Sequence, residues 1–389
     1  MTPRPPLSRR PLLQAGTLGL AGTGLAEVLA ARKTALAPRS VLVVFLSGGL
    51  SQLDSFDMKP EAPARVRGEF QPVATRVPGL QICEHLPGLA NRAHRLTLLR
   101  SLTHWSNEHN EAHTIMLTGR SQLPPGYRPN RPQPSDWPAV TAVAGRMVQD
   151  RNNGLPSGVV LPQRLVNMNQ GGVVTPGQFG GQMGYRHDPW FIEASPYHNI
   201  QRGAYPEYNF PNLGLPFREE ARVFRAPNLT LPHSLTSARF TRRLDVLRNI
   251  EIQQKHLDQA VTARRFGRLR EGAISLLNDP KVRHAFDVTN EKDTEQIRYG
   301  RNSYGWSLLM ARRLIEAGVP LVQVNLGNNE TWDTHGDAFP RFKEKLFPPT
   351  DRGLSALLDD LHDRGPVSYT HLRAHETRHE LVCRLLLEK

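Results

Sequence analysis

The amino-acid sequence predicts an α/β protein with a mostly parallel sheet flanked by helices. A continuous apolar run at 41–46 indicates a buried strand, because the strands of parallel sheets are covered on both faces. A second apolar run at 319–326 follows directly on an amphipathic helix expected at 303–317. Strand–helix–strand alternation of this kind is typical of a parallel sheet with helices on both faces. Two shorter strands are expected at 96–99 and 158–161.

Glycine, proline and capping residues set the boundaries of the other predicted helices. A helix at 110–118 is closed by Gly119, since glycine adopts the left-handed conformation that ends helices. Residues 135–138 supply a cap residue and an early proline, so a second helix is expected from there to about 149. A third helix, at 354–364, has leucines at helical spacing.

Two long stretches between these elements differ in character. Residues 162–235 are rich in Gly, Pro, Asn and aromatic side chains and show little periodicity, which predicts an ordered insertion in a substrate lid or pocket wall. Residues 237–277 become charged and helical, as in a pair of surface helices. The expected domain spans 38–365 and contains 162–235 as an irregular insertion.

The first 37 residues are typical of an export signal. Three basic residues, Arg4, Arg9 and Arg10, precede a weakly apolar segment at 12–30 that ends in a small-residue cleavage site. The run at 8–13 resembles a twin-arginine signal. A plain basic tail and an uncleaved anchor are the alternatives. We therefore expect export by the twin-arginine pathway and a periplasmic or extracellular location.

The other end of the chain carries an unusual histidine pattern. His371, His375 and His379 have the spacing of a metal-binding helix face. The whole segment 366–389, however, closely resembles a translated sequencing-adapter read-through. We expect that it is not native sequence and that the native gene continues beyond the cut. Direct sequencing of the locus tests this, and a native stop codon after Lys389 would contradict it.

Composition excludes several classes of protein. The chain has 389 residues, a net charge of +13 and two cysteines, which leaves ample length for a buried core and excludes a disulfide scaffold or a Cys-rich metal site. No run of 18 or more apolar residues follows the N-terminal segment, so no transmembrane body is expected. The positive charge is dispersed along the chain, and an exported protein is separated from the nucleic acid of the cell. Nucleic acid is therefore not an expected partner.

The first candidate cluster follows the strand at 41–46. Gly48 and Gly49 let the backbone approach a ligand closely, and Ser51 has the hydroxyl of a nucleophile. Asp54 and Asp57 have the carboxylates that hold a metal or orient a base. The alternative is a glycine-rich turn that leads into a capped helix with both carboxylates solvated.

The second cluster lies at the start of the helix at 110–118. His109 and His113 are four residues apart, so a helix places both imidazoles on one face, in a good geometry for binding one metal ion. The alternative is a polar helix start with one histidine packed in the core. Arg120, at the other end of this helix, is a candidate for holding an anionic group, although pairing with a carboxylate is the commoner use of arginine.

The third cluster follows the strand at 319–326. Asp333 and His335 belong to an Asp-x-His-x-Asp motif, whose oxygen and nitrogen ligands suit Zn, Mn or Ca. A turn with an Asp cap is the alternative. In open α/β sheets ligands bind beyond the carboxyl ends of the strands, and all of these polar clusters are expected there.

Several motifs together resemble the domain-of-unknown-function-1501 family, which is abundant in Planctomycetes and related bacteria and looks like a branch of the alkaline phosphatase/sulfatase superfamily. The matching segments are 45–60, 67–70, 82–87, 117–120, 134–138 and 332–337. The resemblance implies a phosphatase-like α/β fold with metal ions at the strand ends. The family continues with a further strand and a late histidine segment that are missing here, which implies a C-terminally truncated domain.

The resemblance also implies roles for individual residues. Asp333 and His335 match superfamily metal ligands, and Ser51, Asp54 and Asp57 follow the first strand. Counting back from Leu-Thr-Gly-Arg at 117–120, the place of the sulfatase nucleophile falls on His109, which is not a serine, threonine or cysteine.

Two functions follow from these residues and this resemblance. One is an exported hydrolase that uses a divalent metal ion to cleave sulfate or phosphate esters of a small molecule or glycan. Its expected catalytic residues are Ser51, His109 and Arg120. Its expected metal ligands are Asp54, Asp57, His109, His113, Asp333 and His335. The other is a non-catalytic envelope or polysaccharide-binding protein that keeps the fold.

Overall fold

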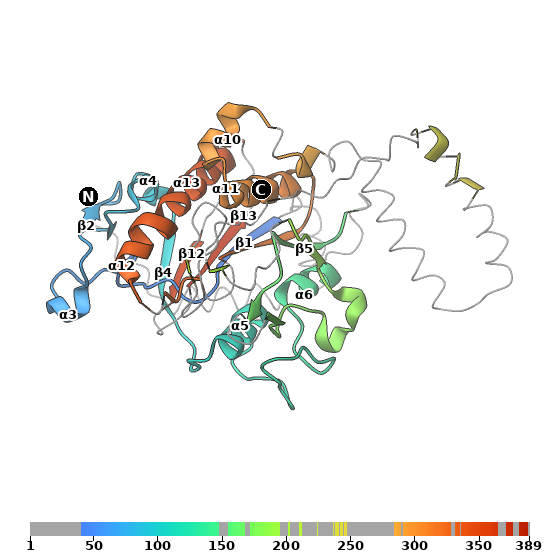
Figure 1. Ribbon diagram of the computed structural model, residues 1–389, viewed down its shortest axis with the longest axis horizontal. Coiled ribbons are helices and arrows are strands. Elements are labelled where there is room, and N and C mark those ends of the chain that lie inside the picture. The colour runs from blue at the N-terminus through green and yellow to red at the C-terminus, as the bar shows by residue number, and fades with distance from the viewer. Residues whose placement is uncertain are drawn as a thin grey trace, which may run out of the picture. The chain divides into compact units, whose positions relative to one another are not determined.

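The computed structural model of the chain (Figure 1) describes the body of the protein from residue 40 onward. The described residues are 40–147, 155–167, 172–194, 201–202, 210–211, 224, 236, 238–240, 242–243, 245–246, 284–288, 291–327, 331–334, 336–364, 371–375 and 381–387. The expected export signal at 1–37 lies outside them. No helix in this described part is both long enough and apolar enough to cross a bilayer.

The centre of the fold is a parallel sheet, as the sequence predicts. Strand β1 (Ser40–Leu46) pairs in parallel with β11 (Leu321–Leu326), which pairs with β5 (Gly158–Leu161), which in turn pairs with β8 (Trp190–Phe191). All six residues of β11 are buried, because it lies between two strands and under helices on both faces. The α/β class and the helix-flanked parallel sheet are confirmed.

The sheet becomes mixed on the other side of β1. The full order is β4-β12-β13-β1-β11-β5-β8, in which β4 (Thr97–Leu102) pairs in parallel with β12 (His371–His375). Strand β13 (Leu381–Leu387) runs antiparallel to both β12 and β1. The backbone of two segments of 366–389 thus occupies the sheet between β4 and β1. That these residues are not native sequence stays a prediction.

The side chains of β1 alternate between two apolar clusters, one on each face of the sheet. Leu42, Val44 and Leu46 belong to the large cluster under α11 (Ser303–Glu316) and α13 (Phe347–Asp363). Val43 and Phe45 belong to a smaller cluster that includes residues of α5 (His109–Thr118). Figure 1 shows α10, α11 and α13 on one face of the sheet and α5 and α6 on the other. The strand's period of two therefore divides the core into two layers.

The smaller elements connect these layers. The short helices and turns are α3 (Ala64–Arg67), α4 (Pro87–Ala90), η1 (Ala93–Arg95), η3 (Gly181–Met183), η4 (Tyr185–His187), α10 (Asp293–Tyr299), α12 (Ala338–Arg341) and the π-helical turn η6 (Phe342–Leu346). The strands outside the main sheet are β2 (Pro72–Ala74), β3 (Gln81–Cys83), β6 (Val166–Asn167), β7 (Val173–Val174), β9 (Gln201–Arg202) and β10 (Phe210–Pro211).

Two expectations about the middle of the chain need correction. Helix α6 (Val140–Met147) begins after 135–138, because the carboxylate of Asp136 accepts a hydrogen bond from the upstream Gln133 amide (2.7 Å) instead of capping the helix. The stretch 162–235 also contains a regular element, since β8 within it forms the edge of the main sheet. That the stretch is an insertion stays a prediction. Its role as a lid lies mostly outside the described residues, as do most of the helices expected at 237–277.

A buried carboxylate ties three helices together on one face of the sheet. Asp360 of α13 is 4% exposed and accepts hydrogen bonds from Arg298 (2.6 Å) and from the hydroxyl of Tyr299 (2.8 Å) in α10. Its second oxygen lies 3.1 Å from Nε of Arg312 in α11. Arg312 also pairs with Glu316 and Arg298 with Glu295, so removal of the shared carboxylate would leave the buried positive charge only partly compensated.

We expect Asp360→Asn to lower the free energy of unfolding by about 3 kcal/mol, the order of the cost of removing one partner from a buried ion pair. Urea unfolding followed by circular dichroism measures it. The exposed Asp363→Asn on the same helix is the control and should change the free energy of unfolding by less than about 0.5 kcal/mol. Equal effects of the two substitutions would contradict the role of Asp360.

Candidate functional site

The candidate site lies where β1 and β11 end side by side at the carboxyl edge of the sheet. The backbone amide of Trp332 donates a hydrogen bond to the carbonyl of Ser47 (3.0 Å), which joins the loop after β11 to the loop after β1. The buried indole of Trp332 donates to the carbonyl of Leu326 (2.8 Å), the last residue of β11. The loop that carries Asp333 is therefore held against the end of β1.

Helix α5 brings the second predicted cluster against the third. Nε2 of His109 lies 2.9 Å from Oδ2 of Asp333, although the two residues are 224 positions apart in the chain. Their side chains are 15% and 17% exposed, so the pair is reachable from solvent. The structure thus brings together an imidazole and a carboxylate from two separate motifs.

His113 lies one helical turn further into the protein. Its side chain is fully buried, its Nε2 lies 3.2 Å from Oγ of Ser47, and its ring packs edge-on against Phe45. Its ring centroid is 6.3 Å from that of His109, as the spacing of four predicts for one face of a helix. Burial, together with the nearby His109 and His104, lowers the pKa of His113 to about 3, so the imidazole is neutral at physiological pH.

His109, His113 and Asp333 are residue types that bind divalent metal ions, but they supply few ligands. Two imidazoles that bind one zinc ion at about 2.0–2.1 Å in tetrahedral geometry have centroids about 5 Å apart, somewhat closer than His109 and His113 stand. Within the described part of the chain, no three His, Cys, Asp or Glu side chains form a group that could hold a metal. His335 lies outside the described residues. In residue type, His109 and Asp333 offer one nitrogen and one oxygen donor, fewer than the four ligands of a tetrahedral zinc site.

The first predicted cluster is engaged elsewhere. The hydroxyl of Ser51 donates to the carboxylate of Asp54 (2.6 Å), and burial raises the pKa of Asp54 against the opposing effect of that hydrogen bond. Asp57 is buried and binds the ammonium of Lys59 through both oxygens (2.9 and 2.8 Å), with Nε of Arg100 at 3.2 Å. No contact among the described residues joins Ser51, Asp54 or Asp57 to the pair of His109 and Asp333.

Arg120 also stands apart from the candidate site. It follows the C-terminal end of α5, whose ten residues place Thr118 about 14 Å along the axis from His109. Its guanidinium lies over the ring of Trp137, 5.0 Å from the centroid. The position of Arg120 suits a surface role better than contact with a group bound between His109 and Asp333.

Ser47 and Asn110 belong to the site, although the sequence did not single them out. Ser47 is buried against His113, and Oδ1 of the Asn110 side chain accepts from Nδ2 of the Asn167 side chain (3.2 Å), which fixes the start of α5. The available signal for Ser47 was its position as the first polar residue after a buried strand. Nothing local distinguished Asn110, because its partner is 57 residues away.

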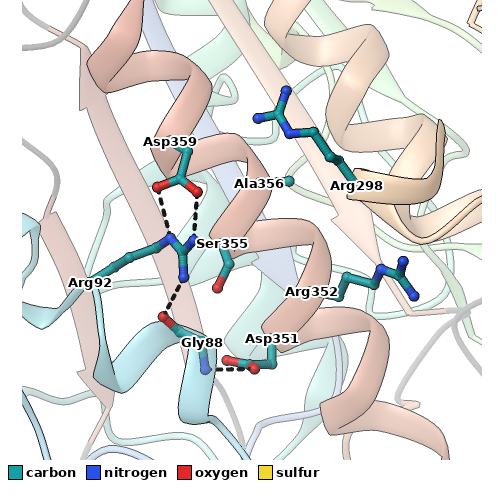
Figure 2. A pocket seen from close by; sticks show the side chains of 8 residues that line it. All are labelled: Gly88, Arg92, Arg298, Asp351, Arg352, Ser355, Ala356 and Asp359. Carbon is teal, nitrogen blue, oxygen red and sulfur yellow. Dashed lines mark hydrogen bonds and ion pairs between the residues drawn. The ribbon is translucent and has the colours of Figure 1, made fainter. Parts of the chain in front are cut away.

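A separate cavity of about 310 Å³ lies between α4, α10 and α13 (Figure 2). Most of its charged side chains are engaged: Arg92 pairs with Asp359 (2.8 and 2.5 Å), Asp351 accepts from the amides of Gly88 and Leu89 (both 2.8 Å), and Arg298 pairs with Glu295 and Asp360 outside the cavity. It contains none of the predicted site residues. These contacts attach α4 to α13 and account for the polar lining.

The buried His113 predicts a pH dependence of stability. Between pH 6.5 and about 3 the unfolded chain binds a proton at this residue and the folded chain does not, so stability falls as the pH drops through this window. One proton corresponds to a slope of about 1.4 kcal/mol per pH unit. We expect His113→Gln to reduce the slope between pH 6 and pH 4.5 by about this amount, measured by urea unfolding. Parallel curves for parent and variant would contradict it.

Comparison with known proteins gives one result that bears on identity. Neither a curated protein nor a solved structure matches the chain significantly. The family model described as protein of unknown function (DUF1501) matches residues 38–371, which cover β1, β4, β5, β8 and β11, the flanking helices and both halves of the site. The chain therefore belongs to the DUF1501 family.

Proposed function

We propose that the chain is an exported, metal-dependent hydrolase of sulfate or phosphate esters. The observation that carries the proposal is the 2.9 Å contact between His109 and Asp333 at the carboxyl edge of a parallel sheet. An imidazole and a carboxylate on two loops are the donors that Zn²⁺ or Mn²⁺ takes, and this edge is where α/β sheets bind ligands.

In this proposal His109 and Asp333 hold a divalent ion, with His335 as an expected third ligand outside the described residues. When bound, such an ion polarises an ester oxygen and lowers the pKa of an attacking water. In the described structure Oδ2 of Asp333 and Nε2 of His109 contact each other directly, which holds both side chains at the same edge of the sheet. The neutral His113 and Ser47 contact each other one helical turn further into the protein, where both side chains are fully buried.

The side chains favour direct attack by water over a covalent intermediate. The hydroxyl of Ser51 donates to the carboxylate of Asp54, and no contact among the described residues brings either side chain to the pair of His109 and Asp333. Ser47 has a neutral histidine beside it, the partner that a serine nucleophile needs, but both side chains are fully buried. His109 occupies the place of the nucleophile in the resemblance to sulfatases, and its Nε2 is engaged by Asp333.

The finer fold assignment and the location belong to the same proposal. We infer an alkaline-phosphatase/sulfatase-like arrangement, supported by a parallel α/β sheet with its polar residues at the carboxyl ends of β1 and β11. Export by the twin-arginine pathway is supported by the basic and apolar pattern of 1–37.

A non-catalytic, polysaccharide-binding protein is the second candidate. It is favoured by the placement of Arg120, the arginine that the sequence suggested for holding an anion, which lies over Trp137 and away from the His109–Asp333 pair. In this case the fold is kept and ester cleavage is absent.

Metal analysis separates the two candidates. We expect the purified protein to retain about one equivalent of a divalent metal by elemental analysis, and His109→Ala and Asp333→Asn each to weaken metal binding at least about tenfold, because each removes a ligand. Glu344→Gln, an exposed carboxylate in the following turn η6, is the control and should leave it unchanged. Absence of metal from the parent protein, with unfolding unaffected by chelator, would contradict the proposal.

The reaction is tested with chromogenic aryl sulfate and aryl phosphate esters. We expect hydrolysis of at least one of them to be lost in chelator and restored by Zn²⁺ or Mn²⁺, and to fall at least about a hundredfold in Asp333→Asn. The control Ser51→Ala should retain activity, because water rather than Ser51 is the proposed nucleophile. Loss of activity in Ser51→Ala with normal metal content would instead assign the serine a catalytic role.

A further inference from the structure

Two tryptophans and an arginine form a rigid exposed surface beyond the end of α5. Trp105 is 59% exposed, yet its indole nitrogen donates to the carbonyl of Ser121 (2.7 Å). Trp137 donates in the same way to the carbonyl of Gln122 (2.8 Å). Because the two acceptors belong to adjacent residues, both indoles are attached to one short stretch of backbone. Arg120 stacks on the ring of Trp137.

The segment around these tryptophans is strongly basic. Residues 119–137 contain three arginines, Arg120, Arg128 and Arg131, all exposed and none in an ion pair within the described part of the chain. The one acidic residue of this segment, Asp136, is buried. Five prolines limit its conformational freedom, so little order remains to be gained on binding. The part that carries Arg128 and Arg131 returns along α5, since the Asn110 side chain donates to that of Asn130 (3.2 Å) and Thr114 donates to the hydroxyl of Tyr127 (3.3 Å). We call Trp105, Arg120, Arg128, Arg131 and Trp137 the cationic–aromatic platform, which extends from the C-terminal end of α5 back along the helix.

The platform is connected to the candidate site through α5 and its approach. Trp105 follows His104, whose charge acts on the buried His113. Helix α5 runs from His109 to the segment that holds both indoles, a length of about 14 Å. A ligand that contacts both the two indoles and the His109–Asp333 pair is therefore an oligomer rather than a single small anion.

We propose that the cationic–aromatic platform binds an anionic polysaccharide. Saccharide rings present apolar C–H faces that stack on flat, immobile indoles, while their sulfate or carboxylate groups pair with arginine forks. The inference deepens the proposed function, on which it rests for the ester chemistry: it assigns the substrate to a charged polymer that is held beyond the end of α5. Single-stranded nucleic acid also stacks on aromatic side chains, and the proposed export disfavours it.

The experiment measures binding of dextran sulfate, unsulfated dextran of the same length and a single-stranded oligonucleotide to the full chain, by calorimetry and by indole fluorescence. We expect dextran sulfate to bind, to alter the fluorescence and to weaken with salt. Trp105→Ala and the triple variant Arg120→Gln/Arg128→Gln/Arg131→Gln should each raise Kd at least tenfold. The triple variant at exposed positions elsewhere, Arg65→Gln/Arg67→Gln/Arg76→Gln, removes the same charge and should change Kd less than twofold.

Each outcome bears on the platform separately from the proposed metal site. Absence of binding, equal effects of the two triple variants, or tighter binding of the oligonucleotide than of dextran sulfate would overturn the inference. Asp333→Asn should keep polymer binding, and Trp105→Ala should keep the metal content. Loss of metal with intact polymer binding would thus contradict the hydrolase alone, and the reverse would contradict the platform alone.

Discussion

The hydrogen bond from the Trp332 amide to the Ser47 carbonyl is the contact on which the candidate site depends. It joins the loops after the two central strands at the level where their ladder ends. The indole of Trp332, buried and bonded to Leu326, prevents the second loop from turning away. With both loops fixed, α5 can present His109 to Asp333 and His113 to Ser47. The position of the polar side chains therefore follows from the packing of one large apolar residue.

Much of the fold could be predicted from local pattern. The buried runs of β1, β5 and β11 and the helix α11 have periodicities that hardly depend on distant residues, and Gly119 ends α5 in the left-handed conformation as expected. The start of α6 could not be predicted in this way, because the amide of Ala139 donates to Phe179, 40 residues further along the chain. Strand β8 has only two residues and becomes a strand by pairing with β5. Where a partner decides the structure, local sequence does not reveal it.

The same distinction separates the predicted site residues. The face shared by His109 and His113 follows from helical geometry alone, and the meeting of His109 with Asp333 follows from placing both motifs at one edge of a parallel sheet. Asp57 was indistinguishable in sequence from a ligand. Lys59, two residues along the chain, compensates the charge of the Asp57 carboxylate together with Arg100 of β4. Because Arg100 is distant in sequence, this structural role of Asp57 could be recognised only from the structure. A carboxylate motif indicates a site only when its charge is not already compensated.

The position in the sheet between β4 and β1, which β12 and β13 fill, has a consequence for expression of this protein. Strands β4 and β1 both direct backbone amides and carbonyls toward this position, and β12 and β13 form hydrogen bonds with them. A chain shortened to end after α13 would present β1, an apolar strand, as a bare edge, and such edges recruit other chains into extended sheets. We therefore expect soluble expression of this domain to require a segment that pairs with the edges of β1 and β4, whatever its sequence.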